Sequence, residues 1–254
     1  MRPPAGRLGL VPRRMVAHCL LLERDDGLTL VDTGFGTADV ADPRRLGGPF
    51  RGLVSPALDP TETALARIRA LGLDPRDVTD IVLTHLDLDH AGGLADLPHA
   101  RVHVYERELA AALAPRISER SRYRAVQWAH GPAWVAHEAR GDSWRGLRAV
   151  RALHDDVVLV PLHGHTRGHA GVAVSTAHGW LLHAGDAYFH ASEATADPHP
   201  PRGLALFQTV LSAEEGLRRR NQETLRHLAA THADVRIFCA HDPDEFAALA
   251  DRPV

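Results

Sequence analysis

The sequence predicts an α/β protein in which two β-sheets are sandwiched between helices. Strand-like and helix-like segments alternate along most of the 254 residues, which is the first sign of this fold class. Polar residues with metal-ligand chemistry follow several of the strand-like segments, so they are expected to gather at one edge of the sandwich. The 44% hydrophobic content is enough to bury a substantial core as one large domain or two fused halves.

The first half of the chain is expected to form a hairpin, two further strands and two helices. Asp59 can cap the first helix and Pro60 suits its first position, whereas Gly72 can end it. The turn of the hairpin is expected at Asp25-Asp26-Gly27. In chain order, we expect strands over residues 16–23 and 27–31, a helix over 59–71, strands over 78–83 and 100–105, and a helix over 106–113.

The second half is expected to end with a helix, a strand and a terminal helix. Ser212-Ala213-Glu214-Glu215 has the spacing of a capping box and is expected to begin the first of these helices. Residues 235–240 are expected to form the closing strand. Asp242 can cap the terminal helix, because a proline follows it and acidic residues occupy the first turn.

One segment fits no regular element well, and a second is expected to be mobile. Residues 115–151 hold three of the four tryptophans, interleaved with arginines. Two interpretations are open: the segment caps the functional site, with rings around an apolar substrate group and an arginine at a carbonyl or carboxylate, or it only packs onto the body. Residues 36–56 are rich in glycine and proline, and we expect a mobile segment that forms a pocket wall.

Composition excludes several classes of protein. The net charge of -3 argues against nucleic acid as a partner, and no stretch approaches the roughly 18 apolar residues that span a membrane. The first 14 residues lack an apolar segment of secretory type, and Cys19 and Cys239 are expected to be core thiols in a reducing compartment. We therefore expect a cytoplasmic protein that acts on a small molecule, with an oligomeric state that the sequence does not indicate. All 29 basic residues are arginine, which excludes a lysine nucleophile.

The segment His85-Leu86-Asp87-Leu88-Asp89-His90 is the most informative feature of the sequence. Four side chains with metal-ligand chemistry fall within six positions, directly after the apolar run Ile81-Val82-Leu83. Ala91-Gly92-Gly93 follows, where the backbone must turn tightly. The pattern predicts a metal site on a loop at the end of a strand; the alternative is a polar loop that binds nothing.

The pattern Thr84-His85-x-Asp87-x-Asp89-His90-x-Gly92-Gly93 resembles the metal-binding signature of the metallo-β-lactamase superfamily, and Asp32-Thr33-Gly34 resembles an early turn of that family. The resemblance spans about Cys19 to His241. It implies a four-layer αββα sandwich, a single domain over residues 1–254, with a cap insert at about 115–151. The other matching segments, in the family's order, are Gly164-His165-Thr166-Arg167-Gly168-His169, Leu182-His183-Ala184-Gly185-Asp186 and Ile237-Phe238-Cys239-Ala240-His241-Asp242.

This resemblance implies a metal-dependent hydrolase with two divalent ions. The expected reaction is hydrolysis of a lactone or carboxylic ester through a metal-bound hydroxide. Asp89 is a candidate proton shuttle, and Tyr188 is a candidate hydrogen-bond donor to the oxyanion, with pocket-wall packing as its alternative. His169 and His183 are expected to orient other groups or pack rather than bind metal. The expected ligands are His85, Asp87 and His165 in one site, Asp89, His90 and His241 in the other, and Asp186 as the bridge.

Asp87 departs from the family pattern, which usually has histidine there. A carboxylate favours harder ions, so iron or manganese are expected beside the zinc that is most common in the family. Two divalent cations, three carboxylates and one hydroxide sum to zero, whereas the common pattern with two carboxylates sums to plus one. An enzyme that works with one metal ion is the alternative.

Three other functions are open on the same fold. One is thioester hydrolysis of the glyoxalase II type, although the chain shows no extra C-terminal domain of that kind. A second is di-iron redox chemistry, because the flavodiiron members carry a glutamate at the Asp87 position; this chain lacks their flavin domain. The third is a ligand sensor that catalyses nothing.

Overall fold

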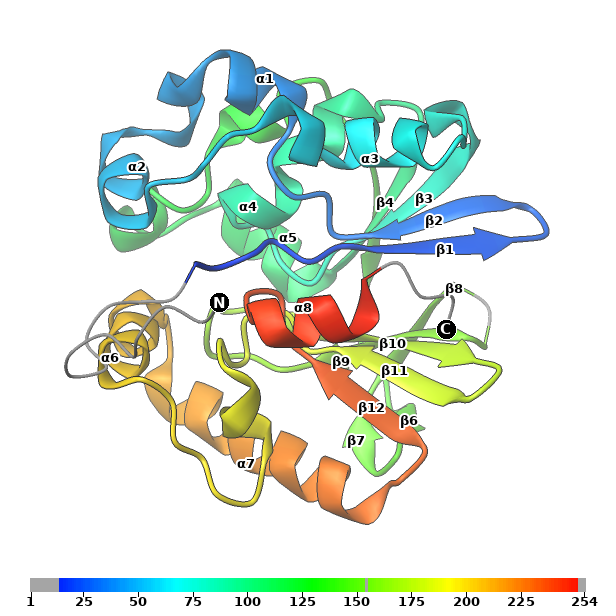
Figure 1. Ribbon diagram of the computed structural model, residues 1–254, viewed down its shortest axis with the longest axis vertical. Helices are drawn as coiled ribbons and strands as arrows, with labels where there is room; N and C mark the ends of the chain where they lie inside the picture. The colour runs from blue at the N-terminus through cyan, green and yellow to red at the C-terminus, as the bar shows by residue number, and fades with distance from the viewer. Residues whose placement is uncertain (1–13, 154, 251–254) are drawn as a thin grey trace, which may run out of the picture. The chain divides into compact units, whose positions relative to one another are not determined.

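The computed structural model describes residues 14–153 and 155–250, and the chain divides into two compact units. The first unit is Cys19–Glu138, and the second is Ala139–Val254 together with Met1–His18. Each unit contains one five-stranded sheet with its own helices (Figure 1). Residues 1–13, on which the expectation about export mainly falls, lie outside the described residues. Among the described helices, none combines the length and apolar character that crossing a bilayer requires.

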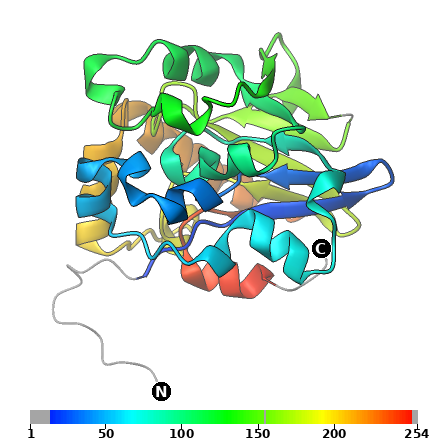
Figure 2. The ribbon, with the colours of Figure 1, turned by 90° about the horizontal axis from the view of Figure 1, so that it is seen from above.

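The sheet of the first unit has the strand order β1-β2-β3-β4-β5. The predicted hairpin is confirmed: β1 and β2 pair antiparallel and appear dark blue in Figure 2. Gly27 begins β2 with φ 134°, and a Cβ atom there would lie 2.8 Å from the Asp77 carbonyl oxygen, so the turn requires glycine. The other neighbours pair parallel. The strands are β1 Leu20–Arg24, β2 Gly27–Val31, β3 Val78–Val82, β4 Arg101–Tyr105 and β5 Ala133–His137.

The helix expected over residues 59–71 is divided in two. The Asp59 carboxylate accepts a hydrogen bond from the Thr61 amide and caps only a 3-10 turn. Thr63 has extended backbone and its hydroxyl accepts from the Ala66 amide, so a second cap begins α3 there. The helix expected over 106–113 is confirmed as α5. The helical elements are α1 Thr37–Ala41, α2 Gly48–Val54, α3 Ala64–Ala70, α4 Leu88–Ala91 and α5 Glu106–Leu113, with 3-10 turns at Pro43–Leu46, Pro60–Glu62, Pro75–Asp77, Gly92–Asp96, Ile117–Glu119 and Ala125–Gln127.

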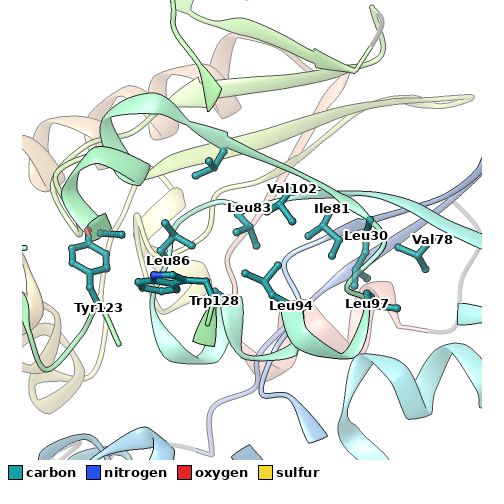
Figure 3. Packing of buried hydrophobic residues seen from close by; sticks show 14 of the residues in the cluster. Leu30, Val78, Ile81, Leu83, Leu86, Leu94, Leu97, Val102, Tyr123 and Trp128 are labelled. Carbon is teal, nitrogen blue, oxygen red and sulfur yellow. The ribbon is translucent and has the colours of Figure 1, made fainter. Parts of the chain in front are cut away.

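The core of the first unit reaches into the predicted metal loop. Leu83 and Leu86 pack with strand residues such as Ile81 and with Leu94 from the turn that follows (Figure 3). Leu86 is 1% exposed, and burying a leucine side chain contributes about 2 kcal/mol. The apolar residues between the polar ones therefore anchor the loop to the sheet.

The sheet of the second unit has the strand order β12-β11-β10-β9-β8, in which only β11 and β12 pair parallel. Leu225 and Leu228 of α7 join the sheet residues in its core, and α7 runs along this sheet in Figure 1. The elements are β8 Val150–Leu153, β9 Val157–Pro161, β10 Ala170–Thr176, β11 Gly179–His183, β12 Val235–Phe238, α6 Arg202–Leu211, α7 Glu215–Thr231 and α8 Pro243–Leu249, with a 3-10 turn at Ala191–Ala194.

The start predicted for the long helix is wrong by two residues, because its N-cap is Glu214 and not Ser212. The Ser212 hydroxyl donates a hydrogen bond to the Gln208 carbonyl oxygen, so it ends α6 instead of capping α7. The cap predicted for the terminal helix is confirmed, because the Asp242 carboxylate accepts from the amides of Asp244 and Glu245 at 2.8 and 3.0 Å. The closing strand expected over residues 235–240 ends at Phe238, so the motif residues from Cys239 to Asp242 follow the strand.

The segment over residues 115–151 contributes to both units. Its two early 3-10 turns are followed by β5 of the first sheet, by the small pair β6 Ser143–Trp144 and β7 Leu147–Arg148, and by the start of β8. Tyr123 and Trp128 are buried in the first core and Trp144 in the second, so these rings pack within their units. That the segment caps a site within one domain stays a prediction. Residues 36–56 contain the short helices α1 and α2 and a 3-10 turn. That this segment is mobile and forms a pocket wall stays a prediction.

Candidate metal centre

The first unit brings the four residues of the predicted metal loop together. Two of them precede α4 and two lie in its single turn. Nε2 of His85 lies 3.5 Å from an oxygen of Asp87, and Nε2 of His90 lies 3.9 Å from an oxygen of Asp89. The two imidazole rings are 4.0 Å apart. The loop therefore offers two pairs, each of one imidazole and one carboxylate, in the combinations that the sequence predicts.

Asp32 orients both histidines of this loop. Its carboxylate is 1% exposed and accepts hydrogen bonds from the Thr84 amide at 2.8 Å, the Thr84 hydroxyl at 2.7 Å and His90 Nδ1 at 2.8 Å. The Thr84 oxygen in turn accepts from Nδ1 of His85 at 2.9 Å. Because these partners assign the proton to Nδ1 in both rings, Nε2 keeps the lone pair that binds a metal.

The turn that carries Asp32 packs tightly against the residues after His90. Asp32 has φ 56°, a left-handed conformation that is uncommon outside glycine. The amide and hydroxyl of Thr33 donate to the His90 carbonyl oxygen at 2.7 and 2.8 Å. A Cβ atom on Gly93 would lie 2.8 Å from the Thr33 carbonyl oxygen, so the backbones approach as closely as only glycine permits.

The second unit gathers the three remaining predicted ligands. Asp186 lies 3.2 Å from Nε2 of His165 through Oδ2 and 3.1 Å from Nε2 of His241 through Oδ1. Nδ1 of His241 donates to the Val16 carbonyl oxygen at 2.6 Å, which leaves Nε2 as the metal-binding atom. All three side chains are buried. One carboxylate between two imidazoles is the arrangement that a bridging ligand needs.

His169 and His183 use both ring nitrogens inside the second unit. Nδ1 of His169 donates to the Leu162 carbonyl oxygen, and its Nε2 accepts from the Asp186 amide at 2.9 Å. Nε2 of His183 donates to the His18 carbonyl oxygen, and its Nδ1 accepts from the Gly185 amide. His169 therefore positions the backbone of Asp186, and His183 fixes the strand that leads to it.

Tyr188 is completely buried, and its hydroxyl donates to Oε1 of Glu245 at 3.0 Å. The other oxygen of Glu245 accepts from the Cys239 amide at 2.7 Å. Glu245 thus connects the segment after Asp186 with the segment before His241. The hydrogen of the Tyr188 hydroxyl is engaged by this contact, and its expected role as an oxyanion donor stays a prediction.

Glu245 predicts a pH dependence of stability. Burial raises its pKa from 4.5 to about 7, so the folded protein holds a proton that the unfolded chain has lost. Its contribution to the free energy of unfolding therefore falls as pH rises from about 4.5 to about 7. In Glu245→Gln, the amide oxygen can accept from Cys239 and the amino group can donate to Tyr188, without any ionisation.

Urea unfolding of both proteins at pH 5 and pH 8 measures this effect. From pH 5 to pH 8, the free energy of unfolding of the wild type should fall by about 2 kcal/mol more than that of Glu245→Gln, after allowance for partial exposure. Comparing the two proteins cancels other titrations, such as that of His18, whose pKa burial lowers to about 3. An equal change in the free energy of unfolding between pH 5 and pH 8 in the two proteins would contradict the prediction.

A small pocket of the second unit lies beside His241. Phe189, Leu204 and Met15 are among its lining residues, and Arg14 and His190 add polar groups. The Phe189 ring meets the His241 ring edge-on at 4.7 Å. The pocket thus presents an apolar wall next to a predicted metal ligand. No sequence pattern indicates this pocket, because its lining residues come from four separate segments.

A family model described as the metallo-beta-lactamase superfamily matches residues 12–241, and the chain belongs to this superfamily. It is 46% identical to a probable metallo-hydrolase of Mycobacterium tuberculosis over 242 residues, which cover 93% of this chain and 78% of that protein. It is 27% identical to the N-acyl homoserine lactonase AttM of Rhizobium radiobacter, with 92% of this chain and 84% of that protein covered.

A solved structure supports the same fold class. The chain matches an N-acyl homoserine lactone hydrolase, solved with the product N-hexanoyl-L-homoserine at its catalytic metal center, with a TM-score of 0.70. The identity is 20%, and the match covers 92% of this chain and 84% of that one. The α/β fold of the metallo-β-lactamase type, predicted from the sequence, is therefore confirmed.

Proposed function

We propose that the protein is a metal-dependent hydrolase that acts on a lactone or carboxylic ester. The orientation of three histidines carries the proposal: His85, His90 and His241 are each held through Nδ1, and each Nε2 lies beside a carboxylate. Histidines held in this way are typical of metal centres. Imidazole donors suit zinc and iron, and carboxylate donors suit harder ions such as manganese.

The proposed centre uses the seven metal ligands that the family resemblance implies. One ion would be held by His85, Asp87 and His165, and the other by Asp89, His90 and His241, with Asp186 as the shared ligand. Membership of the superfamily supports this combination. Because Asp87 replaces a neutral ligand by a charged oxygen, we propose that iron or manganese accompanies or replaces zinc.

Two divalent ions would supply an activated water and polarise the substrate carbonyl. Residues of this chain would transfer the proton and bind the acyl part of the substrate. Asp89 has a carboxylate that is 15% exposed, so it can take a proton from water and pass it to the leaving oxygen. The apolar wall at Phe189 and Leu204 suits the acyl part of a substrate.

Lactones are the favoured substrate class because two similar proteins are an N-acyl homoserine lactonase and an N-acyl homoserine lactone hydrolase. We propose a reducing, cytoplasmic compartment, since Cys19 and Cys239 form no disulfide with each other. Burial raises the pKa of Cys19 to about 12, so this thiol stays protonated. Thioesters are the alternative substrate class.

The test is a substrate panel run on protein purified without added metal. We expect about two transition-metal ions per chain, as the two sets of ligands require, with turnover of lactones or esters that a chelator removes and added metal restores. Turnover of thioesters alone would replace the substrate class, and a protein that hydrolyses none of the panel with metal bound would refute the proposal.

Tyr188→Phe tests the oxyanion role, because simple packing leaves kcat close to wild type.

A further inference from the structure

Arg122 forms an ion pair with the one ligand that departs from the family pattern. Its Nε lies 3.1 Å from Oδ1 of Asp87, and the two side chains are only 13% and 14% exposed. An exposed pair of this kind contributes little, but limited exposure reduces solvent screening and strengthens the interaction. Both residues belong to the first unit, so the contact is internal to it.

The position of Arg122 is fixed by the same carboxylate that fixes the metal loop. Oε1 of the buried Glu108 accepts from the Leu86 amide at 3.0 Å, and it also accepts from the Tyr123 hydroxyl at 3.0 Å. Leu86 directly precedes Asp87, and Tyr123 directly follows Arg122. Glu108 therefore holds Leu86 and Tyr123, the chain neighbours of Asp87 and Arg122. The fold itself thus places the two charged residues beside each other.

We propose that Arg122 is the charge partner of Asp87 and offsets the negative charge that this carboxylate adds to the metal centre. The inference rests on the proposed function, in which Asp87 is a ligand. With its permanent positive charge, the guanidinium returns the pair to the charge of a neutral imidazole. The centre is thus less attractive to divalent cations than three carboxylates alone would make it. Arg122 also restrains the preference for hard ions that Asp87 introduces.

Metal affinity, measured by competition with a chelator, tests this proposal without any substrate. Arg122→Gln should bind zinc and manganese about 3- to 10-fold more tightly than wild type, because a cation beside the ligand has been removed. Arg122→Lys keeps the charge and should stay close to wild type. Arg124→Gln is the matched control: it removes a positive charge from the same segment, where Arg124 Nε donates to the Arg45 carbonyl oxygen.

The double variant Asp87→His/Arg122→Gln completes a double-mutant cycle for this pair of residues. In the Asp87→His background the arginine has no carboxylate to neutralise, so its removal should change manganese-over-zinc selectivity little. Unchanged or weaker binding by folded Arg122→Gln, checked by circular dichroism, would overturn the pairing and leave the hydrolase proposal standing. Wild-type protein that binds neither ion would overturn the metal centre and the pairing together. Normal metal binding without turnover in the substrate panel would count against the hydrolase proposal only.

Discussion

His90→Ala and His241→Ala are each expected to abolish hydrolysis and to empty one metal position. Each variant removes an imidazole that is held through Nδ1 and whose Nε2 is a proposed metal-binding atom. We expect kcat/KM to fall by more than about 100-fold, beyond the 10- to 100-fold typical when a residue that only orients a ligand is lost. Metal content per chain should fall with it.

His169→Ala separates ligands from residues that position ligands. Its two nitrogens hold Leu162 and Asp186, so we expect a loss of about 10- to 100-fold in kcat/KM with measurable turnover. His99→Ala, on an exposed residue, is the control for removing an imidazole. If His169→Ala were as inactive as His90→Ala, the assignment of ligands within residues 164–169 would be wrong.

Most of the structural features that the sequence predicts correctly depend on local patterns of residues. The hairpin over β1 and β2, helix α5 and the Asp242 cap each depend on residues within a few positions of one another, and all three are confirmed. The metal loop is similar, since four candidate ligands alternate with apolar residues that anchor the loop in the core. Periodicity and capping chemistry are local signals, so a single sequence displays them.

Contacts between segments that are distant in the chain could not be predicted from the sequence. Asp32 meets His90 across 58 positions, and no spacing rule marks this pair. Arg122 was one of many arginines in a segment without clear structure, and only the fold singles it out as the partner of Asp87. Helix α7 shows a different limit. Ser212 had the spacing of a cap, but its hydroxyl bonds to the end of α6, a helix that was not predicted.

The turn at Asp32 gives the sharpest test of how the first unit prepares its histidines. Asparagine tolerates the left-handed backbone at φ 56°, so Asp32→Asn should keep the fold of the turn. Its amide oxygen can still accept from Thr84, but its amino group cannot accept the proton on Nδ1 of His90. The imidazole then favours the tautomer with the proton on Nε2, which cannot bind a metal.

We therefore expect Asp32→Asn to weaken metal binding by about 10- to 100-fold, measured by competition with a chelator. Stability should fall by about 1–3 kcal/mol, because buried donors lose an ionised acceptor. Asp80→Asn is the matched control, since Asp80 is a buried carboxylate 2.8 Å from Nε2 of His103 in the same unit, outside the metal loop. It should lose comparable stability and keep its metal affinity. Equal metal affinities in the two variants would show that the carboxylate of Asp32 stabilises the unit without selecting the tautomer of His90.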